Sequence, residues 1–271
     1  MKKISISILV LLFALTCSGI AFARPRPNPP LPAKIPVLLY HQILTDTDTR
    51  LLAFGPGETI IHINVFKQQM QWLKDNGYTT LRLADLEAVV DGRKTVPQKS
   101  VVIAFDDGWS SQLLILPTLR QHRFHAIFAV LIAPEWVDGP YMSFADFVQI
   151  DQSFVGHDII GHTVSHPDVL QLWTAGNLTE VNFQLQDPRT VLQAVLAHPI
   201  FSMAWPYGEY NQQLIGIAQE IGYDSLFTVN PGFNTQGTSP LEFHRSTIDG
   251  SCGINIFIQT VQTGAEIFCG P

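Results

Sequence analysis

The hydrophobic residues of this chain fall into short continuous runs separated by amphipathic stretches. Apolar runs such as IPVLLY at 35–40 and SVVIAF at 100–105 are typical of strands that are buried on both faces of a sheet. Residues 64–76 have apolar positions at helical spacing, with Asn64 as the expected N-cap and Gly77 just beyond the last turn. This alternation predicts an α/β fold with a parallel sheet covered by helices.

About seven β-then-α units follow one another, which suits a distorted (β/α) barrel better than an open sheet. In either arrangement the functional loops are expected at the carboxyl ends of the strands. The other expected strands are residues 78–81, 125–132, 158–161, 200–205, 224–229 and 243–248. The other expected helices are residues 84–90, 110–122, 177–197, 211–221 and 254–263.

The first 34 residues differ in character from the rest. In residues 1–23 two lysines precede an apolar stretch and an A-x-A sequence, which predicts a cleaved signal peptide and export to the periplasm or beyond the cell. A membrane anchor and a lipoprotein attached through Cys17 are the alternatives. Residues 24–34 are Pro-rich and predict an extended tether, and residues 35–271 are expected to form one domain.

Composition excludes several classes of protein. With 46% hydrophobic and 14% charged residues, the chain is too apolar to remain disordered. A net charge of −7 without a block of Lys or Arg argues against a nucleic-acid partner.

Signal cleavage would leave Cys252 and Cys269, and an even pair in an oxidising compartment favours a disulfide over two unpaired thiols.

Polar residues with possible chemistry follow three of the expected strands. Asp106 and Asp107 follow one of them, although Asp-Asp-Gly is also ordinary turn chemistry. His162 and His166 are four residues apart, so a helical turn would place both imidazoles on one face, although capping histidines show the same spacing. Asp107 with these two histidines would supply one oxygen and two nitrogens, the donor pattern of a catalytic zinc site.

A third stretch, AWPYGEYN at 204–211, turns sharply from an expected strand into an expected helix. Such a turn can direct backbone N–H groups at a developing oxyanion, although it is also compatible with a simple β-to-α loop. Because all three stretches sit at strand ends, where a parallel fold gathers its loops, we expect them to form one site.

The three stretches resemble the landmarks of the polysaccharide deacetylase family (carbohydrate esterase family 4), which are F-D-D-G, H-[ST]-x-x-H and P-Y-G. Here they read FDDG at 105–108, HTVSH at 162–166 and WPYG at 205–208, in the family order. The sequence VLLYHQI at 37–43 also matches, and the resemblance covers residues 36–248.

The resemblance implies a distorted (β/α) barrel that removes N-acetyl, or sometimes O-acetyl, groups from carbohydrate polymers with a divalent metal. That metal is usually zinc, with cobalt or nickel as alternatives. It implies that Asp107, His162 and His166 bind the metal and that Asp106 is the general base. Tyr207 would touch the substrate and offer its backbone N–H to the oxyanion.

Many members of the family carry a Leu-x-His near the C-terminus, which this chain lacks. One branch has Tyr-His on the first strand instead, and there that histidine is thought to protonate the leaving amine. This makes His41 the candidate general acid here, with His244 as the second candidate. Tyr-His and the Trp-Pro-Tyr-Gly form are similar to the poly-β-1,6-N-acetylglucosamine deacetylase branch.

Many members also have an arginine that pairs with the base, at the position that Ala204 occupies here. Asp224 matches an acidic position that often orients this arginine. Either Arg245 takes over the pairing or the base is tuned differently, which would leave the pKa of Asp106 higher. Trp109 and Trp205 lie beside the motifs and are candidates for sugar stacking, with core packing as the alternative.

The sequence therefore predicts an exported, metal-dependent enzyme that removes acetyl groups from an N-acetylglucosamine-containing polysaccharide. An O-acetyl polysaccharide esterase is the nearest alternative. A catalytically inactive carbohydrate-binding barrel is the other, and the missing Leu-x-His and Ala204 would suit it.

Overall fold

The computed structural model describes residues 33–133 and 140–270, which belong to one compact unit. The expected signal peptide, Cys17 and nearly all of the expected tether lie outside the described residues. None of the helices in the described ranges combines the length and the apolarity needed to cross a bilayer.

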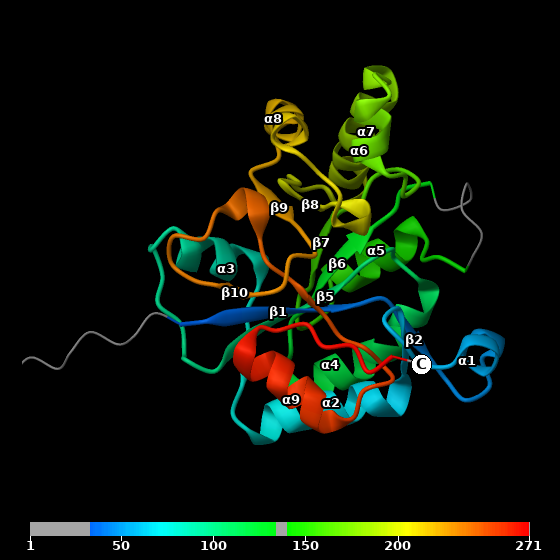
Figure 1. Cartoon of the computed structure of the whole chain (residues 1–271), viewed down its shortest axis with the longest axis vertical. Coiled ribbons are helices and arrows are strands. Elements are labelled where there is room, and N and C mark those ends of the chain that lie inside the picture. The colour runs from blue at the N-terminus through cyan, green and yellow to red at the C-terminus, as the bar shows by residue number, and fades with distance from the viewer. Residues whose placement is uncertain (1–32, 134–139, 271) are drawn as a thin grey trace, which may run out of the picture. The chain divides into compact units, whose positions relative to one another are not determined.

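A curled sheet of mostly parallel strands forms the centre of this unit (Figure 1). The strands are β1 (Ile35–Tyr40), β2 (Gln42–Leu44), β3 (Ile60–His62), β4 (Thr79–Thr80), β5 (Ser100–Phe105), β6 (Ile127–Val130), β7 (Asp158–Gly161), β8 (Ser202–Ala204), β9 (Ser225–Phe227), β10 (Phe233–Asn234) and β11 (Ser246–Thr247). The main path runs β10-β1-β5-β6-β7-β8-β9, with β4 paired to β5 and β11 paired to β1. Only β10 runs antiparallel to its neighbour, while β2 and β3 form a separate parallel pair.

The path does not close on itself, because β9 and β10 stand at its two ends. Phe243, which precedes β11, bridges to the end of β9 and partly covers this gap. The prediction of an α/β fold with about seven mainly parallel strands is therefore confirmed, in the form of a distorted and incomplete barrel.

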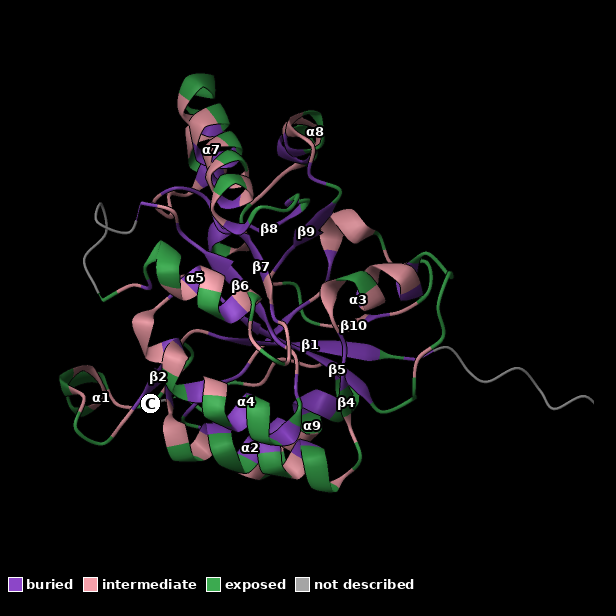
Figure 2. Cartoon of the chain, turned by 180° about the vertical axis from the view of Figure 1, so that it is seen from behind, coloured by how far each residue is buried: buried purple, intermediate pink, exposed green. Residues whose placement is uncertain are grey.

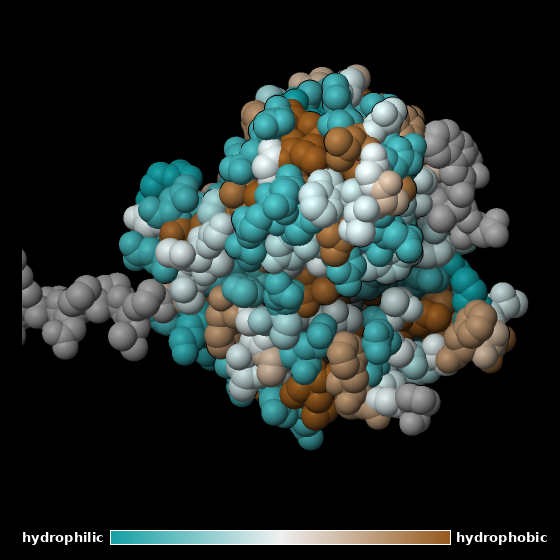
Figure 3. Space-filling model, turned by 45° about the horizontal axis from the view of Figure 1, so that its top comes forward, coloured by the Kyte–Doolittle hydropathy of each residue, from teal (hydrophilic) through white to brown (hydrophobic). Residues whose placement is uncertain are grey.

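Helices cover the sheet on both faces and, except for α1, which has no buried residue, turn apolar residues toward it (Figures 1 and 2). They are α1 (Thr49–Phe54), α2 (Ile63–Asp75), α3 (Leu83–Val90), α4 (Leu116–His122), α5 (Phe144–Asp151), α6 (Val169–Thr174), α7 (Leu178–Leu196), α8 (Gln212–Ile221) and α9 (Ile254–Thr263). Short 3₁₀ turns are η1 (Ser110–Ile115), η3 (Pro206–Gly208) and η4 (Pro240–Glu242). The face in Figure 3 is mostly hydrophilic, with small separate hydrophobic patches, as expected for a surface in contact with water.

The strands β1 and β5 are buried along their whole length, which is why both read as continuous apolar runs. A large core cluster on one side of the sheet includes Phe66, Phe105 and Phe128, whose rings pack against one another through Phe105. A smaller cluster under α3 fills the other side. Burial on both faces holds the parallel strands in register and so determines where their ends lie.

Several local expectations need correction. The helix α2 begins at Ile63, and its N-cap is His62, whose Nδ1 accepts from the backbone N–H of Asn64. The expected helix over 110–122 is divided into η1 and α4. The elements β2, α1, β3, α5, α6 and β10 were not expected, although Ser143 and Asp146 form a capping box that signals the start of α5.

Candidate active site

The three motifs meet at the carboxyl ends of neighbouring strands. Asp106 and Asp107 follow the last residue of β5, His162 follows β7, and Trp205 follows β8. Because β5, β6, β7 and β8 are adjacent and parallel, these ends lie along the same edge of the sheet. The structure therefore places the three motifs along one edge of the sheet, as the sequence predicted.

The backbone in these loops takes left-handed conformations at residues that are not glycine. Among the described residues six such positions have positive φ, and four of them belong to the motif loops: Asp107 at 74°, Thr163 at 71°, His166 at 62° and Tyr207 at 58°. The other two follow the last turns of α4 and α7. Such conformations cost on the order of 1–3 kcal/mol each, and they cluster at functional sites.

His162 and His166 therefore do not lie on a helical turn, as their spacing had suggested. Both belong to the loop between β7 and α6, and the left-handed turns at Thr163 and His166 fold this loop back on itself. The Thr163 hydroxyl accepts from the backbone N–H of His166 and closes the turn. The two imidazoles meet with their ring centroids 4.9 Å apart.

Asp107, His162 and His166 form a set of convergent donor atoms. Oδ1 of Asp107 lies 3.4 Å from Nε2 of His162 and 3.4 Å from Nε2 of His166. This oxygen is buried and has no hydrogen bond of normal geometry within the described chain. In a tetrahedral zinc site with bonds of about 2.1 Å, two ligand atoms are separated by roughly 3.4 Å. The three side chains thus fit a divalent metal ion, which they would hold through one oxygen and two nitrogens.

Neighbouring groups orient these donors. The Nδ1 of His162 lies 2.9 Å from the backbone oxygen of Ala204, which directs Nε2 toward Asp107. The indole N–H of Trp109 donates to the other oxygen of Asp107 at 2.8 Å. Burial, together with the charge of His162, lowers the pKa of His166 to about 4, so this imidazole is neutral at neutral pH, as a metal ligand must be.

Asp106 is buried beside this set and is held by a different partner. Its Oδ1 accepts from Nη1 of Arg245 at 2.6 Å, and its Oδ2 lies 3.8 Å from Nε2 of His162. Burial alone would raise the pKa of Asp106, but the charges of Arg245, His162 and His41 outweigh it and hold that pKa below its ordinary value. The carboxyl group is thus ionised and available as a base.

The sequence left open whether Arg245 pairs with Asp106, and in the structure the two side chains are paired. Arg245 directly precedes β11, which pairs with β1, and its side chain is buried. Its Nε donates to the backbone oxygen of Thr228 at 2.6 Å, which fixes the guanidinium beside Asp106. The pairing residue therefore comes from the far end of the sequence rather than from the position of Ala204.

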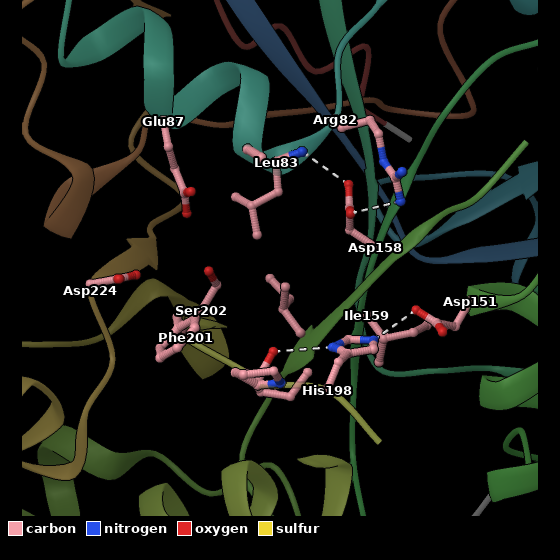
Figure 4. A pocket seen from close by; sticks show the side chains of 14 residues that line it. Arg82, Leu83, Glu87, Asp151, Asp158, Ile159, His198, Phe201, Ser202 and Asp224 are labelled. Carbon is pink, nitrogen blue, oxygen red and sulfur yellow. Dashed lines mark hydrogen bonds and ion pairs between the residues drawn. The ribbon is translucent and has the colours of Figure 1, made fainter. Parts of the chain in front are cut away.

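Asp224 does not take part in this pairing, contrary to the role in base tuning that the motif suggested. It precedes β9 and so lies at the amino end of that strand, whereas the motifs follow the carboxyl ends. Figure 4 shows Asp224 beside another cavity of about 460 Å³, together with Glu87 and Ser202. The expected strand 224–229 already began at Asp224, so this residue stands at the end of the strand away from the motifs.

A cavity of about 330 Å³ opens over the motif loops. His41, which follows β1, lines it, and Nδ1 of His41 is buried without a hydrogen-bond partner in the described chain. Tyr207 also lines it and is 62% exposed, with its ring against that of His166. His244 is absent from the lining residues, so the geometry favours His41 over His244 as a group that reaches substrate.

The two tryptophans beside the motifs differ in their surroundings. Trp205 has no exposed surface, and its ring stacks on Tyr210, so it cannot present a face to a sugar and instead supports the wall of the cavity. Trp109 stacks on Tyr141 at 4.4 Å between ring centroids, with the Arg50 guanidinium 5.7 Å from its ring. The prediction that Trp205 stacks on a sugar is therefore corrected: its ring is packed in the interior.

Other residues of the cavity carried no signal in the sequence. Glu58, Thr59, Glu266 and Phe268 line it from segments without a motif or a clear periodicity. The last two belong to the end of the chain, where Cys252 and Cys269 are joined by a disulfide with Cα atoms 5.3 Å apart. Because the two sulfurs are bonded to each other, the nearby Asp249 has no thiolate with which to share a metal.

Comparison with known proteins agrees with this geometry. Residues 93–226 match the family model described as polysaccharide deacetylase. The YxkH protein of Bacillus subtilis (strain 168) is 24% identical, over 79% of this chain and 71% of its own length. The poly-β-1,6-N-acetyl-D-glucosamine N-deacetylase of Escherichia coli (strain K12) is 23% identical over 84% of this chain, which spans only 39% of that enzyme. The solved structure of the Streptococcus pyogenes deacetylase PplD in complex with acetate is 25% identical with a TM-score of 0.73, covering 85% of this chain and 99% of that one.

Carboxylates and histidines gathered at the strand ends of a parallel (β/α) fold form a site that can hold a metal ion and accept or donate protons. Residues 93–226 therefore carry a polysaccharide deacetylase domain, and the named deacetylases among the relatives support a hydrolase that acts on amide bonds. The matched residues include Asp106, Asp107, His162, His166 and Tyr207, whereas His41, Arg245 and the end of the chain lie outside the matched range.

Proposed function

We propose that this protein removes acetyl groups from an N-acetylglucosamine-containing polysaccharide outside the cytoplasm, after cleavage of residues 1–23, with a zinc ion held by Asp107, His162 and His166. The observation that carries the proposal is the position of Oδ1 of Asp107, 3.4 Å from Nε2 of each of the two histidines, with the carboxylate of Asp106 beside them. The substrate class is supported by the named activity of the E. coli relative.

Amide hydrolysis needs a nucleophile, stabilisation of the oxyanion and a proton for the departing amine. A divalent metal, when bound, would lower the pKa of a coordinated water and polarise the acetyl carbonyl. Asp106 is placed to accept the proton of the attacking water, and Arg245 keeps it ionised for that purpose. Asp107 cannot share this task, because its free oxygen faces the two histidines.

Two further groups act on the substrate. The left-handed backbone at Tyr207 belongs to a tight turn at the cavity wall, where its N–H would donate to the acetyl oxygen as charge develops there. His41 lines the same cavity and would give its proton to the sugar nitrogen when the carbon–nitrogen bond breaks. The products are acetate and a glucosamine unit.

The proposal predicts acetate release from a β-1,6-linked N-acetylglucosamine pentamer. Release should stop when a chelator removes the metal and should return when zinc is added, with cobalt and nickel compared as replacements. Acetylated xylan serves as the alternative substrate in the same assay. Faster release from xylan would make the protein an O-acetyl esterase, and binding of the pentamer without release would indicate a carbohydrate-binding barrel.

Replacing His41 with alanine tests the general acid. We expect kcat to fall about a hundredfold, because a positioned acid contributes about 10²–10⁴ in rate, while the zinc content stays that of the wild type. His244→Ala is the matched control, since His244 lies outside the cavity lining. A rate that is unaffected in His41→Ala but reduced in His244→Ala would transfer the role to His244.

A further inference from the structure

The active-site cavity has one wall that comes from the end of the chain. Glu266 and Phe268 line it together with His41 and Tyr207, although they follow α9 and lie outside the residues that match the family model. We call residues 264–269 the C-terminal segment. In Figure 1 the chain returns from α9 past β1 toward β2, which brings this segment to the carboxyl ends of the strands.

Four contacts hold the C-terminal segment in place. The Thr247 N–H donates to Oε1 of Glu266 at 2.8 Å, and the Ser246 hydroxyl donates to the backbone oxygen of Gly264 at 2.8 Å. The N–H of Cys269 donates to Oδ2 of Asp249 at 2.9 Å. The fourth contact is the Cys252–Cys269 disulfide, which closes the loop right beside Phe268. The segment is therefore fixed to β11 and to the loop after it.

Phe268 is held at the cavity in an exposed state. Its surface is 46% exposed, whereas Trp205, which lines the same cavity, has no exposed surface. The ring of Tyr207 is exposed as well, but it packs against the metal-ligand candidate His166. Phe268 is thus an exposed aromatic ring of the cavity wall that does not stack on the motif residues in the described structure.

The size of the cavity indicates what such a ring would meet. About 330 Å³ lies at the small end of the range for ligand pockets, which suits one sugar ring but not a polymer. The neighbouring rings of a polysaccharide must therefore lie outside the cavity, next to its exposed lining residues, which include Phe268 of the C-terminal segment and Glu58 and Thr59. The apolar face of a sugar ring is the complement of an exposed aromatic face.

We propose that the C-terminal segment is a specificity element of this enzyme, in which Phe268 stacks on the sugar ring next to the one that reacts and the Cys252–Cys269 disulfide keeps it there. This rests on the proposed function, because it takes the ligand to be an acetylated polysaccharide. Phe268 acts in binding along the chain of sugars, whereas Asp106 and His41 act in the hydrolysis of the amide bond.

The test compares chain lengths. In Phe268→Ala the KM for the β-1,6-linked N-acetylglucosamine pentamer should rise about tenfold, while the KM for N-acetylglucosamine itself changes less than twofold. The value of kcat on the pentamer should change less than KM. Phe268→Trp should keep a KM close to that of the wild type, since it keeps an aromatic face. Phe154→Ala is the matched control, because Phe154 is 84% exposed and lines a different cavity.

Breaking the disulfide provides an independent test of the proposal. Reduction of the wild type, or the double change Cys252→Ser and Cys269→Ser, should raise the KM for the pentamer as Phe268→Ala does. Because loss of a disulfide can also destabilise the fold, the melting temperature is measured in parallel. If Phe268→Ala has the wild-type KM for both the monomer and the pentamer, the proposal is overturned. This holds even if the disulfide variants fail to fold.

Calorimetric binding of the pentamer separates this inference from the proposed function. Binding without acetate release, with the affinity lost in Phe268→Ala, would support the role of Phe268 and contradict the deacetylase activity. Release with an unchanged KM and affinity in Phe268→Ala would contradict only the role of Phe268. A wild-type protein that neither binds nor cleaves the pentamer contradicts both.

Discussion

Asp106→Asn is expected to lower kcat about a thousandfold and to leave the zinc content unchanged. A positioned general base contributes about 10²–10⁴ in rate, and an amide cannot take the proton of the attacking water. Asparagine keeps the size of the side chain and an oxygen that can accept from Nη1 of Arg245, so the local packing should persist. Acetate release from the pentamer and the metal content of the purified protein are the two measurements.

Asp107→Asn is the matched control for this experiment, because it makes the same chemical change one residue away. We expect it to reduce zinc affinity strongly, since the carboxylate oxygen that faces both histidines becomes a weaker, uncharged donor. If zinc were instead lost from Asp106→Asn and retained in Asp107→Asn, the roles of the two neighbouring carboxylates would have to be exchanged.

Arg245→Met should have the largest effect on stability, with the free energy of unfolding reduced by about 3–5 kcal/mol. Both members of the Arg245–Asp106 pair are buried, with 1% and 4% of their side-chain surface exposed, so removal of the cation leaves an uncompensated carboxylate in the interior. Methionine occupies a similar volume, which limits the contribution of an empty cavity. Urea unfolding at pH 7 measures the change.

The double variant Arg245→Met with Asp106→Asn separates charge from packing. If the charge pair causes the loss, the double variant should lose clearly less than the sum of the two single variants. Arg93→Met is the control, because Arg93 pairs with Asp91 on the surface and should change stability by less than about 0.5 kcal/mol. Strictly additive losses in the double variant would contradict a direct interaction of Arg245 with Asp106.

Much of the fold could be predicted from local patterns. The bounds expected for β1, β5 and β7 agree with the structure, because strands buried on both faces read as nearly continuous apolar runs, with a polar residue only at the first position of β5 and β7. The short elements between residues 41 and 62 could not be predicted. There β2 and β3 have only three residues each, too few to show a period, and α1 contains no buried residue that would create an apolar face.

For the site, the donor types could be predicted but not the backbone that presents them. Asp107, His162 and His166 are brought together because the carboxyl ends of parallel strands share one edge. The left-handed turns at Thr163 and His166 were not foreseen, since a β-branched residue such as Thr163 rarely adopts this conformation and the surrounding packing must impose it. The role of Asp224 was wrongly assigned because it was taken from the family match, although the expected strand 224–229 begins at this residue and so places it away from the carboxyl ends that form the site.

Hydrophobic periodicity and residue chemistry act over a few residues, and they were sufficient for the strands, the helices and the identity of the candidate metal donors. Partners distant in sequence depend on the sheet topology. Arg245 reaches Asp106 across 139 residues because β11 pairs with β1, and Phe268 reaches the cavity because the C-terminal segment is bonded back onto the sheet. The residues around Arg245 and Phe268 do not indicate these contacts, because both contacts form only when the parallel strands have assembled.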